Sequence, residues 1–106
     1  MKQVKAYIHH VRTNAVVEAL ADAGYRNIAL LDAKGTLKPL SDDERNYSSE
    51  GGGLLIVEAR LELVCEDTQV DAVTAIIRTH GRIGSEVSGW VHVSAMEQVL
   101  PIGGGQ

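Results

Sequence analysis

The sequence predicts an α+β fold of the ferredoxin-like kind, a βαββαβ sandwich with a long loop between its second and third strands. Apolar residues alternate along four segments, which is the period of a half-buried strand. They recur every three or four residues along two others, which is the period of an amphipathic helix. The order is strand, helix, strand, polar loop, strand, helix, strand. We expect one domain over residues 1–106, with both helices on one face of an antiparallel sheet.

The first half is predicted to contain a strand, a helix and a second strand. Either Thr13 or Asn14 can cap the helix by accepting a hydrogen bond from a backbone amide. Gly24 is placed for the left-handed residue that follows the last helical turn. The expected ranges are 4–11 for the first strand, 14–23 for the helix and 27–33 for the second strand.

The second half repeats this order. Alternation over 54–65 predicts the longest strand. Thr68, with Asp71 three residues later, resembles a capping box before a helix that ends near Gly81. A glycine-bearing turn follows. The remaining ranges are 90–93 for a short strand, 96–102 for an edge strand and 103–106 for a frayed tail.

Residues 34–53 are predicted to be a flexible loop, because Gly, Pro, Ser and charged residues occur there without an apolar repeat. Loops of this length are uncommon in compact domains, and they are usually functional or without fixed structure. The loop therefore indicates a ligand-responsive regulator.

Composition limits the class of protein. The chain has 106 residues, four aromatic side chains and no Phe, so its core must consist of Val, Ile, Leu and Ala, and assembly into an oligomer would add buried area. The formal net charge of −4 argues against a nucleic-acid partner, which needs a clustered basic face. Because no apolar stretch reaches the length of a membrane span or resembles a signal peptide, we expect a cytoplasmic protein.

The sheet face away from the helices is expected to meet a partner subunit, because it is a mixed surface. The single cysteine, Cys65, rules out an internal disulfide and is expected to be a buried, inert thiol. Trp90 is expected to pack at the subunit boundary. The expected residues of this open face are Tyr7, Ile56, Val64, Trp90 and His92.

The polar residues suggest no catalytic set and no metal site. His9 and His10 are neighbours on a strand and point to opposite faces, so we expect surface or interface histidines. Asp42, Asp43 and Glu44 are expected to be solvated loop charges rather than an acid–base pair. Cys65 has no activating partner in sequence.

Five segments together resemble the P-II signal-transduction family over nearly the whole chain. The resemblance implies a non-enzymatic homotrimer that binds an adenine nucleotide in each of three clefts between subunits. It also implies that the long loop, the T-loop of that family, docks on a transporter or an enzyme. The segments are Val16–Leu20 with Gly24, Ala33–Gly35, Arg60–Val64, Ala75–Thr79 and Gly81–Gly84.

The resemblance implies a nucleotide site at the loop base, the third strand and the glycine turn. Within that site, the backbone amides of 81–84 and the Arg82 side chain would face phosphates, with Arg60 or Lys34 beside them. Arg60 also has Glu58 and Glu62 as ion-pair partners on its own strand face. The nucleotide residues are Gly35, Thr36, Arg60, Glu62, Leu63, Val64, Gly81, Arg82, Ile83 and Gly84, and the partner-docking residues are Leu37, Leu40, Arg45 and Tyr47.

Departures from the family pattern argue against 2-oxoglutarate as a ligand. Lys38 and Pro39 stand where nitrogen-regulating members have an arginine–glutamine pair, and Pro39 lacks the side-chain amide that helps to hold magnesium. Glu58 replaces an expected lysine, and Gly51 replaces the tyrosine that is modified.

The expected phosphate site has also lost cations, because Trp90, Pro101 and Gly103 stand at basic positions of the family. Each lost charge-assisted contact is worth about 1.5–3 kcal/mol, so ADP or AMP is favoured over ATP. The pattern is similar to a divergent P-II-like branch associated with carboxysomes or bicarbonate transporters. That likeness implies a bicarbonate site at Gly35, Thr36 and Lys38.

Two alternatives remain open at this point. One is a metal-responsive trimer of the same fold, similar to divalent-cation tolerance proteins, that uses histidines and loop carboxylates. The other is a nitrogen-regulating P-II protein, which Pro39, Glu58 and Gly51 disfavour.

Overall fold

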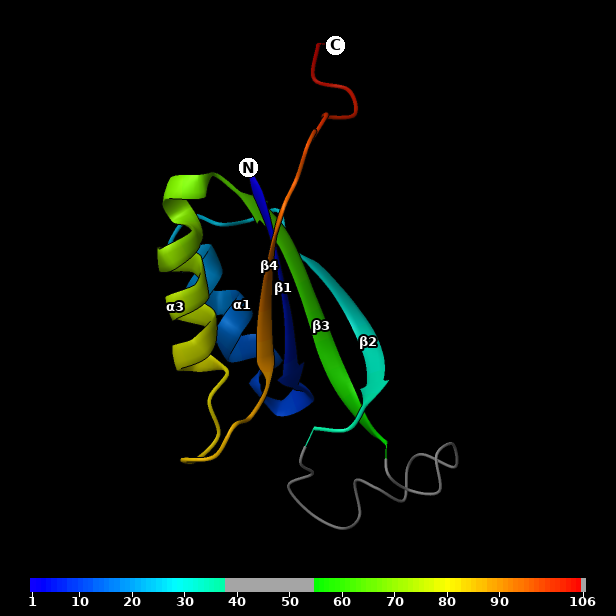
Figure 1. Ribbon diagram of the computed structural model, residues 1–106, viewed down its shortest axis with the longest axis vertical. Helices are drawn as coiled ribbons and strands as arrows, with labels where there is room; N and C mark the ends of the chain where they lie inside the picture. The colour runs from blue at the N-terminus through cyan, green and yellow to red at the C-terminus, as the bar shows by residue number, and fades with distance from the viewer. Residues whose placement is uncertain (38–54, 106) are drawn as a thin grey trace.

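The computed structural model describes residues 1–37 and 55–105, which form four strands and two helices (Figure 1). Two short 3-10 turns, His10–Arg12 and Asp67–Gln69, each lead into a helix. The α+β class is confirmed. The elements are β1 (Lys2–His9), α1 (Thr13–Asp22), β2 (Ala29–Gly35), β3 (Ile56–Cys65), α3 (Val70–His80) and β4 (Trp90–Ala95).

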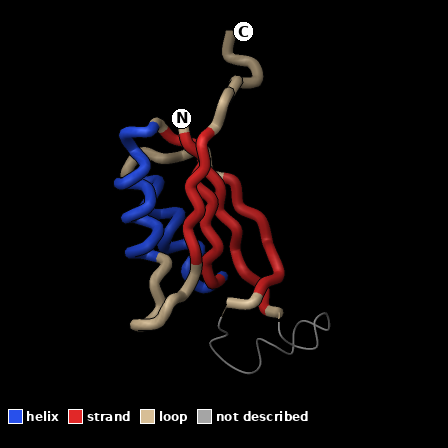
Figure 2. The backbone as a smooth tube through the Cα atoms, viewed as in Figure 1, coloured by secondary structure: helices blue, strands red, loops and turns tan. Residues whose placement is uncertain are grey.

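The four strands form one antiparallel sheet in the order β2-β3-β1-β4. Both helices cover the same face, and no helix of residues 1–37 and 55–105 lies on the other face (Figure 2). This order, with two strand–helix–strand halves interleaved, is the ferredoxin-like fold that the sequence predicts.

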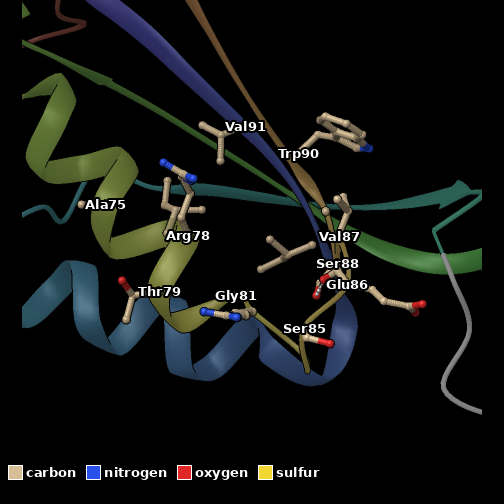
Figure 3. A pocket seen from close by; sticks show the side chains of 14 residues that line it. Ala75, Arg78, Thr79, Gly81, Ser85, Glu86, Val87, Ser88, Trp90 and Val91 are labelled. Carbon is tan, nitrogen blue, oxygen red and sulfur yellow. Dashed lines mark hydrogen bonds between the residues drawn. The ribbon is translucent and has the colours of Figure 1, made fainter.

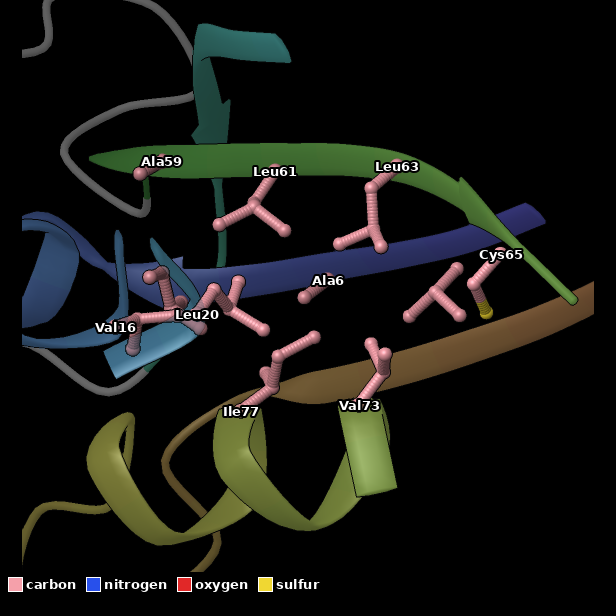
Figure 4. Close-up of a cluster of buried hydrophobic side chains, with 11 residues drawn as sticks. Ala6, Val16, Leu20, Ala59, Leu61, Leu63, Cys65, Val73 and Ile77 are labelled. Carbon is pink, nitrogen blue, oxygen red and sulfur yellow. The ribbon is translucent and has the colours of Figure 1, made fainter. Parts of the chain in front are cut away.

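The core lies between the helices and the sheet (Figure 4). Alternate residues of β1 from Val4 to Ile8 and of β3 from Ala59 to Cys65 point into it, as the alternation predicts, and Ala6 is paired with Leu61 at its centre. Val16, Leu20, Val73 and Ile77 close it from the helices. Burial of this apolar surface is the main contribution to stability.

The strand boundaries differ from the prediction by two residues, except at the end of β3 and the start of β4. β1 ends at His9 rather than Val11, because the chain turns into the 3-10 turn there. β2 continues to Gly35, because its ladder with β3 extends to the pair Gly35 and Ile56. The first two residues of the predicted loop thus belong to the strand, and the loop residues 38–54 lie outside the described residues.

The predicted N-terminal caps of both helices are wrong. Arg12 occupies the N-cap of α1 without a side-chain hydrogen bond, while His9 Nδ1 accepts from the Val11 amide at 3.2 Å. The capping box before α3 joins Glu66 and Gln69, because the 3-10 turn moves the start of the helical region toward the N-terminus. Gly24 does adopt the left-handed conformation, with φ +97°.

The predicted edge strand over 96–102 is absent from the described residues. The Met96 amide donates to the Met1 carbonyl at 3.1 Å, and beyond it the chain leaves the sheet (Figure 1). β1 begins at Lys2, so the tail runs past the end of its only neighbouring strand and has no ladder to join.

Cys65 is buried at the end of β3, as predicted. Burial raises the pKa of its thiol, and the carboxylates of Asp67 and Glu66 raise it further. We expect iodoacetamide at neutral pH to label Cys65 much more slowly in the folded protein than in denaturant, because the thiolate is the reactive form. Equal labelling rates, followed by mass spectrometry, would contradict this burial.

Candidate functional site

The open face of the sheet is amphipathic. Tyr7 and His92 lie with ring centroids 5.5 Å apart. Arg60 Nε lies 3.2 Å from Glu62 Oε1, an ion-pair distance without hydrogen-bond geometry. The register places two rows of side chains across this face, Leu31, Arg60, Tyr7 and Trp90 in one and Ala29, Glu62, Lys5 and His92 in the next.

One expectation for exposure is corrected, because Ile56, predicted on the open face, is 1% exposed. Leu30 is the ladder partner of Leu61 and lies on the helix-covered side of the sheet. It is nevertheless 47% exposed, because β2 is the edge strand farthest from the helices (Figure 1). None of the described helices is long and apolar enough to cross a membrane.

A cavity of about 770 Å³ lies between the end of α3 and the start of β4, and we call it the turn cavity (Figure 3). It contains Gly81 and Arg82 from the predicted nucleotide set. Arg78 adds a second guanidinium, and Ser85 and Ser88 add hydroxyl groups. Two cations and two hydroxyls suit an anionic, phosphate-bearing ligand.

The glycine turn in this cavity is held by its own hydrogen bonds. The Gly81 amide donates to the Ile77 carbonyl at 2.8 Å, and the Ile83 amide donates to Ser88 Oγ at 2.9 Å. Arg82 Nε donates to the Gly84 carbonyl at 2.9 Å, and Gly84 has φ +63°. Ile83 and Gly84 of the predicted nucleotide set do not line the turn cavity. A phosphate contact there would therefore fall to the Arg82 amide and to the terminal nitrogens of Arg82.

A second cavity, of about 290 Å³, lies at the end of β2, and we call it the base cavity. It brings Gly35 and Thr36 of the predicted set together with the aromatic rings of the open face. Trp90 is 61% exposed and borders both cavities. The lining residues are Tyr7, Lys34, Gly35, Thr36, Leu37, Glu58, Trp90 and His92.

Glu58 occupies the floor of the base cavity. Its side chain is 4% exposed, and its Oε2 accepts from the Leu37 amide at 2.9 Å. A Cβ on Gly35 would overlap the Glu58 carboxylate, so a larger residue at position 35 would require that carboxylate to move.

The remaining predicted residues are distributed over three places. Arg60, Glu62 and Val64 lie on the open face, and the Arg60–Glu62 pair is the partnership that the strand spacing predicted. Leu63 lies in the core, so only its backbone can reach a ligand. The predicted residues outside the described part of the chain are Lys38, Pro39, Leu40, Arg45, Tyr47 and Gly51.

The expectation for His9 is wrong. His9 is 1% exposed, because its ring turns back to cap the 3-10 turn after β1. The ring centroids of His9 and His10 lie 4.5 Å apart, with the ring planes tilted by 33°. Within residues 1–37 and 55–105, no group of three His, Cys, Asp or Glu residues is placed to hold a metal ion.

Sequence reasoning missed several lining residues. Arg78, Ser85 and Ser88 in the turn cavity follow from no motif, although the serines and Gly89 come directly after the glycine turn. The sequence predicts Glu58 only as the replacement of a lysine and as a partner of Arg60. Its contact with the Leu37 amide, beyond the end of β2, depends on the tertiary structure.

Comparisons with known proteins agree with this fold. A family model described as "Nitrogen regulatory protein P-II" matches residues 1–105. Proteins named nitrogen regulatory protein P-II from Microchaete diplosiphon and Nostoc punctiforme are 31% and 30% identical to this chain, over 100% of it and 95% of their own length. One from Rhizobium meliloti is 28% identical over the same shares. The chain therefore belongs to the nitrogen regulatory protein P-II family.

Proposed function

We propose that this chain is a non-enzymatic regulator that assembles as a homotrimer and binds ADP or AMP in the clefts between subunits. The bound nucleotide would then control docking on a transporter or on an enzyme of carbon or nitrogen metabolism. The observation that supports this best is the division of the expected nucleotide residues among the turn cavity, the base cavity and the open face. Residues that lie apart on one chain can surround the same ligand when two subunits meet, each contributing part of the site.

The open face supports assembly. Leu31 is exposed in the same row as Tyr7 and Trp90, so a large apolar and aromatic area faces outward from a small core. Exposed areas of this kind mark contacts with another protein.

The charge of the turn cavity supports a short phosphate chain. Its cations are Arg78 and Arg82, and Glu86 places a carboxylate on the same lining. Trp90 stands at the border where a further cation would be needed for a third phosphate. ADP or AMP is therefore favoured over ATP.

Thermal unfolding tests the proposal. We expect ADP or AMP to raise the melting temperature of the purified protein, because a ligand at one hundred times its Kd stabilises the native state by about 2.7 kcal/mol. Absence of a shift with any adenine nucleotide at millimolar concentration would contradict the proposal.

Arg82→Ala is expected to weaken nucleotide binding by about 10- to 100-fold, the loss of one charge-assisted contact, without lowering the melting temperature of the free protein. Arg26→Ala, which removes an exposed arginine remote from both cavities, is the matched control. Calorimetric titration measures the nucleotide affinity of both variants. Equal affinities in the two variants would remove Arg82 from the site.

A nitrogen-regulating role is the second candidate, because the similar proteins carry that name. Binding of 2-oxoglutarate together with magnesium and ATP would favour it. The predicted bicarbonate site at Gly35, Thr36 and Lys38 is not part of this proposal. Lys38 lies outside the described residues, and Gly35 and Thr36 line the base cavity together with the Glu58 carboxylate, which would repel a second anion.

A further inference from the structure

We infer that Glu58 is a built-in anion of the base cavity, and that it sets the class of ligand this cavity accepts. Its carboxylate takes the place of a small carboxylate or bicarbonate ion from solution. The cavity would therefore reject such anions in the natural protein and would bind them once the charge at position 58 is removed.

The first argument is the burial of Glu58. It lies on the open face of β3, opposite Ala33 of β2 and His9 of β1. Glu62, four residues along the same face, is only half-buried. Glu58 is 4% exposed because the end of β2 lies against its carboxylate. A buried charge is stable only when polar groups replace its water.

The second argument is the geometry at the end of β2. The carboxylate lies against the Cα of Gly35 and accepts the Leu37 amide at 2.9 Å. A glycine that permits close approach, followed by a backbone N–H that points at a negative charge, is the arrangement with which proteins bind free anions. Here the anion is part of the chain.

The third argument is the lining of the cavity. Lys34 and Thr36 contribute an ammonium group and a hydroxyl, and Tyr7 and His92 contribute groups that can donate hydrogen bonds. These groups favour a negative charge. A second anion in a cavity of about 290 Å³ would lie close to the Glu58 carboxylate, and the two like charges would repel each other.

Glu58→Gln tests the inference, because it removes the charge and keeps an oxygen that can accept the Leu37 amide. Calorimetric titration with acetate and with bicarbonate, without nucleotide, is the measurement. We expect the variant to bind these ions at least about tenfold more tightly than the natural protein. Glu18→Gln, an exposed position on α1, makes the same change in net charge and is expected to bind no better than the natural protein.

Equal anion affinity in the natural protein and Glu58→Gln would overturn the inference, and so would a gain of the same size in Glu18→Gln. A second measurement needs no variant. In the natural protein, the amide resonances of Gly35 and Leu37 are expected to stay unchanged when acetate replaces chloride at constant ionic strength, and their displacement would also overturn it. Neither measurement contains nucleotide, so failure of nucleotide binding would be seen separately.

Discussion

Leu61→Ala is expected to lower the free energy of unfolding by about 3 to 4 kcal/mol. Leu61 is fully buried at the centre of β3, where it faces both helices (Figure 4). Alanine would remove three carbon atoms and leave a cavity that the paired strands cannot close. Since a domain of this size has about 5–15 kcal/mol of stability, a large share would be lost. Urea unfolding followed by circular dichroism measures this change in the free energy of unfolding.

Leu30→Ala is the matched control, because Leu30 is the ladder partner of Leu61 and lies on the same side of the sheet. Its side chain is 47% exposed, so we expect a loss below about 1 kcal/mol. Equal losses in the two variants would mean that Leu30 is covered as well, and the difference in burial described here would then be wrong.

Gly89→Ala is expected to lower the free energy of unfolding by about 3 kcal/mol, the upper end of the range for overpacking. A Cβ at position 89 would overlap the backbone carbonyl oxygen of Tyr7 and approach the Cα of Ile8 to 3.5 Å. Those atoms belong to β1, which pairs with strands on both sides, so they cannot move without weakening the sheet.

Gly84→Ala separates this overlap from backbone strain. Gly84 has φ +63° and no atom within 4 Å of an added Cβ, so its substitution is expected to lose only about 1 kcal/mol, the strain of a left-handed residue. Chemical denaturation of the two variants measures the difference. A loss in Gly89→Ala no larger than in Gly84→Ala would show that the β1 backbone yields to the added methyl group.

Much of the fold could be predicted because its signals are local. Periodicity identified all four strands and both helices, with α1 shifted by one residue and β4 longer by two. The strand predicted over 96–102 is not formed. An apolar segment forms a strand only where it can pair with a neighbouring strand, and the pairing between β4 and β1 ends at Lys2 and Ala95. The predictions of the N-terminal helix caps were wrong, because a short 3-10 turn precedes each helix.

The candidate site could be predicted only in part. The structure places Gly81 and Arg82 of the predicted turn at the turn cavity, and Gly35 and Thr36 at the base cavity, whereas Ile83 and Gly84 line neither. Their relation to Trp90, which borders both cavities, depends on the packing of β4 beside β1.

The sequence by itself determined which segments become strands and helices, because their hydrophobic periods are properties of neighbouring residues. It also determined the P-II resemblance, which the family comparison confirmed. Only the tertiary structure decided what Glu58 does. On a strand of alternating residues Glu58 and Glu62 look equivalent, yet only Glu58 lies beneath Gly35 and accepts the Leu37 amide. That difference arises from pairing between β2 and β3, which brings residues more than twenty positions apart into contact.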